Sequence, residues 1–390
     1  MNTLDWFRKA VIYQVFIDRF NGFKETGNSP GFLGGTINGV LQKLDYFVEL
    51  GINVLWLSPF YQTLNYHGYH ITDFKKVDSH FGTEDDLKRL IREAHKKGLY
   101  VIADFVPNHC SYQHPFFRDA QHNKNSEYHD WFIFENWPDR YRCFLDFGEL
   151  PKLNLNNREA RNYMLGVADY WLSLGLDGYR IDHAIGPSHG FWKVFRKTMK
   201  AKYPKAVFIG EVWCDGLDKK LIKTTGLKNK THKRKFGISQ EGIQLEYYGE
   251  LDGVLDFALN NILVEAVKNG EDLQSNKDLK SKIRKHFQQV PTDYIMVTFL
   301  DNHDMDRFLL HCNGDIQVML NAFETLLSTG QPVVIYYGTE NCRYNKVPIH
   351  NSIPHSDLAV RAPFDWDGIN RQFVEGFKNL ITKYRNQENQ

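Results

Sequence analysis

A strand-like apolar run followed by a helix-like segment recurs along this 390-residue chain. This order is typical of βα units, in which crossover helices connect parallel strands. Eight apolar runs fit the pattern: residues 11–16, 53–57, 99–105, 177–182, 206–211, 253–257, 295–300 and 332–337. Eight such units in one chain predict an α/β fold of the TIM (β/α)8 barrel type.

The segments between these runs include four with helical apolar spacing: residues 83–97, 158–174, 318–328 and 372–384. The first begins at Thr83, carries acidic residues in its first turn and ends in lysines before Gly98. A capping side chain at the start and cations at the end complement the helix dipole. This segment is therefore expected to be a helix on the outside of the barrel.

One interval breaks the rhythm. Residues 110–154 separate the third strand from the next helix and are rich in aromatic, His and Asp side chains. Long excursions of this kind in a compact domain usually serve function. We expect residues 1–109 and 155–390 to form the barrel, with 110–154 as a small subdomain inserted after strand 3.

The charge balance narrows the choice of partners. The formal net charge is +1, which argues against binding to nucleic acid or to anionic lipid. The basic run Lys219–Lys235 is interpreted as a solvated loop face. No stretch of about 18 apolar residues predicts a membrane span. The N-terminus lacks a secretory leader pattern, and five scattered cysteines fit reduced thiols, so we expect a cytoplasmic protein unless a leader has been removed.

Carboxylates stand where several of the predicted strands end, which is where TIM barrels carry their active sites. Asp182 ends the fourth run and Glu211 ends the fifth. Glycoside hydrolysis needs two carboxyl groups beside one bond: one protonates the leaving oxygen, and the other attacks the anomeric carbon or activates water. Arg180 lies two residues before Asp182 on the same strand face, where its charge would keep Asp182 ionised. Neighbouring carboxylates would favour the protonated form of Glu211, as a general acid requires.

Four stretches at strand ends carry a resemblance to a known family: residues 104–109 (DFVPNH), 178–182 (GYRID), 210–213 (GEVW) and 299–304 (FLDNHD). In this order they resemble the signature regions of the α-amylase family, family 13 of the glycoside hydrolases. The similarity runs from about residue 8 to about residue 385 and includes residues 34–36 (GGT), 51–59 (GINVLWLSP), 67–70 (HGYH) and 332–340 (PVVIYYGTE).

The resemblance implies a role for each matched residue. Asp182 matches the catalytic nucleophile, Glu211 the general acid/base, and Asp304 the third carboxylate, which holds sugar hydroxyls. Four further residues match positions that serve the sugar beside the cleaved bond: the orienting Arg180, the hydrogen-bonding His109 and His303, and the stacking Tyr69. The implied function is a retaining hydrolase of α-1,4-glucosidic bonds in starch, maltooligosaccharides or cyclodextrins.

The sequence also departs from the family pattern. Ile185 and Gly186 stand where many α-amylases carry a Lys-His pair, which leaves the product pattern open. The same change weakens the case for the family's calcium site, although Asn108 matches its usual side-chain ligand. No cofactor is required, and calcium binding is left open. Residues 150–154 (LPKLN) resemble the corresponding motif of neopullulanases and cyclomaltodextrinases, which leaves some α-1,6 cleavage open beside α-1,4 cleavage.

The last predicted helix is followed by only six polar residues, RNQENQ, so we expect no C-terminal β-sandwich domain. Its absence would expose an apolar patch on the barrel, which leaves both a monomer and a homodimer open.

Three alternatives accompany the hydrolase hypothesis. A 4-α-glucanotransferase would use the same residues, with a sugar in place of water as the acceptor. A non-catalytic amylase-like binding protein is disfavoured, because Asp182, Glu211 and Asp304 are all present. An unrelated barrel enzyme is disfavoured because the sequence has neither a metal cluster nor a Gly-rich phosphate loop.

Overall fold

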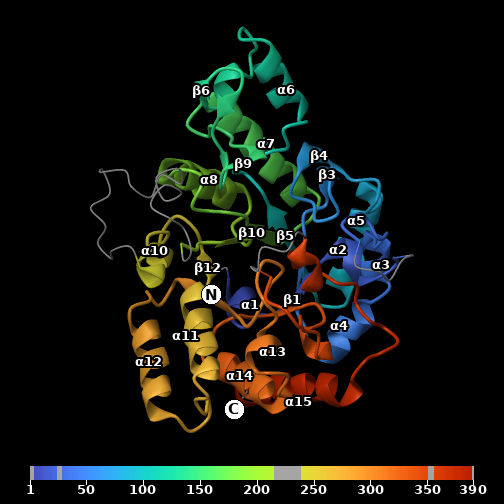
Figure 1. Ribbon diagram of the computed structural model, residues 1–390, viewed down its shortest axis with the longest axis vertical. Helices are drawn as coiled ribbons and strands as arrows, with labels where there is room; N and C mark the ends of the chain where they lie inside the picture. The colour runs from blue at the N-terminus through green and yellow to red at the C-terminus, as the bar shows by residue number, and fades with distance from the viewer. Residues whose placement is uncertain (1–3, 24–28, 215–238, 350–354, 389–390) are drawn as a thin grey trace. The chain divides into compact units, whose positions relative to one another are not determined.

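A computed structural model describes residues 4–23, 29–214, 239–349 and 355–388 (Figure 1). Eight parallel strands close a barrel in the order β1-β14-β13-β12-β11-β10-β5-β2, which confirms the predicted TIM barrel. The strands are β1 (Val11–Val15), β2 (Val54–Leu57), β5 (Tyr100–Phe105), β10 (Gly178–Ile181), β11 (Val207–Gly210), β12 (Gly253–Leu255), β13 (Ile295–Phe299) and β14 (Val333–Tyr336). Each lies within two residues of its predicted bounds.

The barrel strands are buried on both faces, which is why they read as continuous apolar runs. All five residues of β1 are buried, and Val11 pairs with Val333 while Ile12 pairs with Val54. Burial of this much branched apolar surface is the main favourable contribution to the folding of the barrel.

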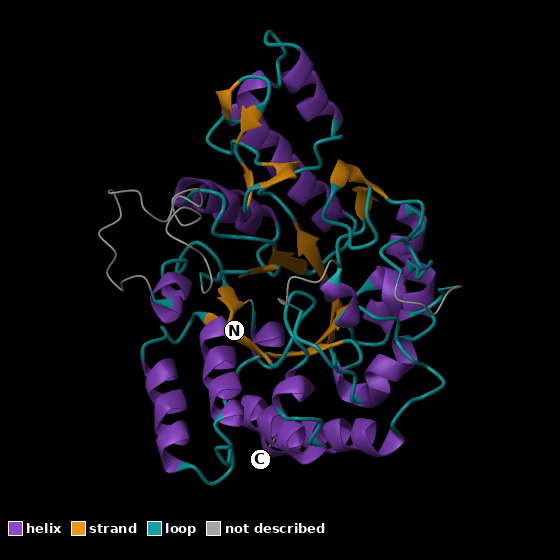
Figure 2. Cartoon of the chain, viewed as in Figure 1, coloured by secondary structure: helices purple, strands orange, loops and turns teal. Residues whose placement is uncertain are grey.

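The chain divides into two compact units. The first comprises Met1–Ser58, His80–Val101 and Leu255–Gln390. Its helices are α1 (Asp5–Arg8), α2 (Ile17–Phe20), α3 (Ile37–Leu41), α4 (Leu44–Leu50), α5 (Glu84–Lys96), α11 (Phe257–Lys268), α12 (Lys277–Gln288), α13 (Phe308–His311), α14 (Ile316–Leu327), α15 (Arg371–Glu388), and the 3-10 turns η2 (Thr339–Asn341) and η3 (Ser356–Ala359). Helices α11 and α12 run side by side (Figure 2).

The second unit comprises Pro59–Ser79 and Ile102–Val254. Besides its barrel strands it contains β3 (Tyr61–Thr63), β4 (Ile71–Val77), α6 (Pro115–His122), η1 (His129–Trp131), β6 (Phe134–Asn136), β7 (Arg140–Tyr141), β8 (Cys143–Phe144), β9 (Phe147–Pro151), α7 (Arg158–Ser173), α8 (His189–Lys202) and α10 (Gln240–Leu245). Within this unit, α6 and β6 lie at the end away from β10 (Figure 1).

The helix ends follow their capping residues. Thr83 and Asp86 form a reciprocal capping box at the start of α5, as the sequence predicts. The predicted helix at 158–174 is confirmed as α7, with Asn157 as its N-cap. Helix α14 begins two residues before the predicted start, because Asp315 accepts hydrogen bonds from the first turn. Helix α15 extends to Glu388, past the predicted end at 384.

Two predictions are not decided by these elements. The segment 110–154 contains α6, η1 and four short strands, but its boundaries as a separate subdomain stay a prediction. The basic run Lys219–Lys235 lies outside the described residues. Among the helices that the structure describes, none combines the length and apolar character needed to cross a membrane.

Candidate active site

The register between β5 and β10 places two charged side chains next to each other. Arg180 of β10 pairs with Asp104 of β5, and paired residues on neighbouring parallel strands face the same side of the sheet. The Arg180 Nη1 atom accordingly donates to Asp104 Oδ1 at 2.7 Å. Both side chains are fully buried, so each charge depends on the other for compensation.

The same guanidinium reaches both candidate catalytic carboxylates. Arg180 Nη1 lies 3.0 Å from Asp182 Oδ1, and Arg180 Nη2 lies 2.5 Å from Glu211 Oε1. Burial alone would lower the pKa of Arg180, but the charges of Asp104, Glu211 and Asp182 outweigh it and raise the pKa above its usual value. Arg180 therefore stays cationic, and all of the contacts favour ionised carboxylates.

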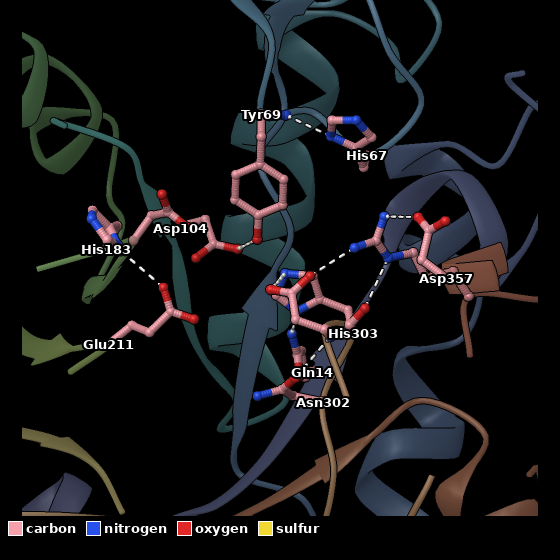
Figure 3. Close-up of polar contacts among 12 residues, drawn as sticks. Gln14, His67, Tyr69, Asp104, His183, Glu211, Asn302, His303 and Asp357 are labelled. Carbon is pink, nitrogen blue, oxygen red and sulfur yellow. Dashed lines mark hydrogen bonds and ion pairs between the residues drawn. The ribbon is translucent and has the colours of Figure 1, made fainter. Parts of the chain in front are cut away.

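The residue after Asp182 holds Glu211 from its other side. The His183 backbone N–H donates to Glu211 Oε2 at 2.9 Å (Figure 3). His183 has φ of 42°, a left-handed conformation that is uncommon outside glycine. The Ala184 N–H also donates to the Glu211 carbonyl at 2.9 Å. The turn after β10 thus fixes the Glu211 side chain. The bond from the His183 N–H to Glu211 was not predicted from the sequence.

Two buried histidines in this unit are neutral. Burial, with a smaller effect from His70, lowers the pKa of His109 to about 3. Burial also lowers the pKa of His183, with Lys152 as the next cause. The ring of Phe144 lies 5.0 Å from the ring of His109 and 4.6 Å from that of His183. The His109 ring is buried, and a hydrogen bond with the Tyr69 backbone partly opposes the fall in its pKa, so the ring is held beside Tyr69.

Tyr69 is tied to the same group. Its hydroxyl donates to Asp104 Oδ2 at 3.0 Å, and its backbone N–H donates to His67 Nδ1 at 3.2 Å (Figure 3). Asp104 thus accepts from both Tyr69 and Arg180. The sequence analysis gave Asp104 no site role, yet its carboxylate is the shared partner of two predicted site residues.

Asp304 and His303, which follow β13, form a second group within the first unit. His303 Nε2 lies 3.0 Å from Asp304 Oδ2, and Gln14 of β1 contacts His303 Nδ1 at 2.9 Å. Arg361 donates to Asp304 Oδ1 at 2.7 Å and to the His303 carbonyl at 2.8 Å. A further Arg361 bond of 2.6 Å reaches Asp357. The Asp304 side chain is 50% exposed, so these contacts set its orientation.

The sequence analysis missed Gln14 and Arg361. Gln14 could have been recognised in the sequence, because it is a polar residue within an otherwise apolar predicted strand, and it is buried in the structure. Arg361 follows η3 in a segment without strand or helix periodicity, so no pattern marks it. Asp301 lies in the same stretch as Asp304, residues 299–304, but has a structural role. Its carboxylate accepts hydrogen bonds from the Phe308 N–H and the Thr339 hydroxyl.

A closed parallel barrel with buried, Arg-linked carboxylates at its strand ends defines a (β/α)8-barrel protein equipped for acid–base chemistry. Residues 14–380 match the family described as "Alpha amylase, catalytic domain". The chain belongs to the α-amylase family.

Individual relatives agree with this assignment. The chain is 33% identical over 383 residues to Alpha-amylase 2 of Dictyoglomus thermophilum, covering 96% of this chain and 63% of the relative. It is 31% identical over 359 residues to a cyclomaltodextrinase of Thermoanaerobacter pseudethanolicus, covering 86% and 58%. Among solved structures, the cyclic α-maltosyl-(1→6)-maltose hydrolase of Arthrobacter globiformis superposes with a TM-score of 0.81 at 26% identity, covering 97% and 83%. The chain thus spans less than two thirds of the length of these two curated relatives.

Proposed function

We propose that this protein is a retaining α-glucan hydrolase that cleaves α-1,4-glucosidic bonds, and some α-1,6 bonds, in starch, maltooligosaccharides or cyclodextrins. The observation that carries the proposal is the contact of one guanidinium, that of Arg180, with both Asp182 and Glu211 on neighbouring strand ends. The names of relatives support the substrate class: they include a cyclomaltodextrinase and a type III pullulan hydrolase from Thermococcus kodakarensis.

The proposed reaction has two steps. Asp182 attacks the anomeric carbon while Glu211 protonates the departing glycosidic oxygen, and a covalent glycosyl ester forms on Asp182. Glu211 then takes a proton from water, the water oxygen attacks the same carbon, and the ester bond to Asp182 breaks. Two displacements at one carbon release a sugar of the α-configuration. Arg180 supports the first step because its charge keeps Asp182 ionised and aligned.

The resting contacts of Glu211 bear on the first step. The Arg180 ion pair and the His183 N–H both favour an ionised Glu211, whereas the sequence analysis expects the protonated form. We infer that a sugar entering the site separates Glu211 from Arg180, which allows the carboxyl group to take up its proton.

Four other residues complete the proposal. Asp304 would hold sugar hydroxyls as the third carboxylate, and Tyr69 would form the stacking platform. Neutral His109 would donate to or accept from a sugar hydroxyl, which is supported by its burial in the neutral form. His303 would reach a sugar hydroxyl through Nε2, which it shares with Asp304 Oδ2 at 3.0 Å.

The roles of the two carboxyl groups can be tested separately. Asp182→Asn should lower kcat on maltoheptaose by more than about 10³-fold, whereas Asp139→Asn, at an exposed turn, should match the parent. Asp182→Gly with added azide should form a β-glycosyl azide, because azide then attacks opposite the leaving group. Glu211→Ala with azide should form the α-azide from the covalent intermediate.

Substrate range and transfer are read in the same assay. Maltoheptaose, cyclodextrin, pullulan and soluble starch are incubated with the parent, and products are separated by chromatography. Shorter α-configured sugars support the hydrolase. Products longer than the substrate would move the assignment to a 4-α-glucanotransferase. A folded parent that turns over none of the four would contradict the proposal and favour an amylase-like binding protein.

We further propose a cytoplasmic location, supported by five cysteines that are all free thiols. Subcellular fractionation with an antibody to the chain tests this, and recovery in the medium would contradict it. The proposal covers both a monomer and a homodimer, which sedimentation would distinguish.

A further inference from the structure

The family implies a calcium ion held in part by Asn108, and the surroundings of that side chain test the fit. Asn108 Oδ1 is buried and has no hydrogen-bond partner among the described residues. It lies against the backbone of Gly186, because a Cβ atom added there would meet Asn108 Oδ1 at 2.0 Å. An unpartnered buried oxygen of this kind calls for a cation or a donor beside it.

A cation is already present at this point. Lys152 Nζ donates to the Gly186 carbonyl at 2.6 Å, so an ammonium group stands beside the residue that Asn108 touches. The backbone of Lys152 belongs to the same cluster: it bridges to His109, and the next residue, Leu153, donates to the Asn108 carbonyl at 2.9 Å.

Calcium does not fit these surroundings. It needs six to eight oxygen ligands, usually including carboxylates, at about 2.3–2.6 Å. Within the part of the chain that the structure describes, no group of three or more His, Cys, Asp or Glu side chains could hold a metal. An ammonium on the Gly186 carbonyl would also repel a divalent ion. Asn108 is therefore placed as a neighbour of Lys152 rather than as a metal ligand.

We propose that the Lys152 ammonium takes the place of a calcium ion in this protein, joining the segment after β9 to the loop that follows Asp182. The loop matters because Gly186 closes a turn onto the His183 carbonyl at 2.9 Å, and His183 in turn donates to Glu211. Lys152 is thus a positioning residue that acts on Glu211 through this turn. The inference rests on these contacts and on family membership, not on the proposed reaction.

The first test measures melting temperature, so it does not depend on activity. The full chain is dialysed against EDTA and then melted with and without millimolar calcium chloride. We expect identical melting temperatures in both conditions and no heat of calcium binding by calorimetry. A melting temperature that falls by several degrees in EDTA, or a saturable calcium heat, would overturn the proposal.

The second test exchanges the cation. Lys152→Met removes the ammonium and should lower the melting temperature by several degrees in a way that calcium does not restore. Lys124→Met, at an exposed lysine of the same unit, should melt like the parent.

Two outcomes of the exchange would also overturn the proposal: a Lys152→Met protein as stable as the parent, or one whose lost stability calcium restores. If Lys152→Met does not fold, Lys152→Gln, which keeps a donor without the charge, serves for the same comparison.

Discussion

The Gln14 amide donates from Nε2 to Nδ1 of His303 across 2.9 Å, and both side chains are buried. Because Nδ1 accepts this bond, the ring carries a proton on Nε2, which faces Asp304 Oδ2 at 3.0 Å. A side chain on β1 thus sets the tautomer of a histidine that follows β13, and that histidine holds the third carboxylate.

This relationship predicts the effect of Gln14→Glu. A carboxylate at this position accepts instead of donating, so it draws a proton to Nδ1 and favours the imidazolium form of His303. We expect kcat on maltoheptaose to fall by about 10- to 100-fold, with a new ionisation in its pH profile. Gln113→Glu, at an exposed position, is the matched control. An unchanged pH profile for Gln14→Glu would show that the tautomer does not depend on Gln14.

Arg180→Lys tests the shared guanidinium. A lysine ammonium lacks the planar fork that reaches Asp104, Asp182 and Glu211 together, so at least one buried carboxylate loses its contact with this cation. Breaking a buried pair costs about 3–5 kcal/mol in the free energy of unfolding. The free energy of unfolding, measured with urea, and kcat should both fall clearly.

Arg140→Lys is the matched control for this change, because Arg140 forms an exposed ion pair with Glu135, worth about 0–1 kcal/mol. Equal losses for the two variants would contradict the importance of the buried cluster.

The barrel could be predicted from the sequence because each strand is a short apolar run bounded by turn residues, and burial on both faces leaves that pattern intact. The hairpins within residues 110–154 could not be predicted from the sequence. Strands β7 and β8 have two residues each, which is too short for any periodicity. The turn between β8 and β9 places Leu145 and Asp146 at positive φ, without the glycine that usually marks such a turn.

The identities of the site residues could be predicted, but their connections could not. Asp182 and Glu211 are recognisable as carboxylates at strand ends. The bond from Arg180 to Asp104, by contrast, spans 76 positions and follows from the pairing register of β5 with β10. Arg361 lies 57 positions from Asp304. Contacts of this kind depend on how the loops fold back, which no local pattern encodes.

Arg361→Met tests whether that distant contact orients Asp304. The variant loses the bonds to Asp304, the His303 carbonyl and Asp357, so the half-exposed Asp304 side chain keeps its contact with His303 but is less firmly oriented. We expect kcat to fall by about 10- to 100-fold, as is typical when the partner of a site residue is removed. Asp357→Asn keeps Arg361 in place and should lose less activity. Parent-like kcat in Arg361→Met would mean that Asp304 does not need Arg361 for its orientation.

Glu340 should make stability depend on pH. Its Oε1 accepts hydrogen bonds from Tyr13 at 2.5 Å and from Tyr46 at 2.7 Å, while Oε2 has no partner among the described residues. Burial raises the pKa of Glu340 to about 7, although both tyrosine hydroxyls oppose the shift. The folded state therefore holds this proton more tightly than the unfolded state, whose glutamate pKa is about 4.3.

The sign follows from proton linkage. Below about pH 4 both states are protonated, and the stability associated with the neutral carboxyl group is fully present. As the pH rises toward 7 the unfolded state releases its proton first, so this stability is lost and stays lost above pH 7.

Glu340→Gln keeps an acceptor for both tyrosines and cannot titrate. Its free energy of unfolding relative to the parent should therefore rise between pH 5 and pH 8, by at most about 3 kcal/mol. Urea unfolding at several pH values measures this difference, with the exposed Glu375→Gln as the control. A difference that is constant across this range would show that Glu340 is ionised in the folded protein throughout, with its charge compensated by a cation.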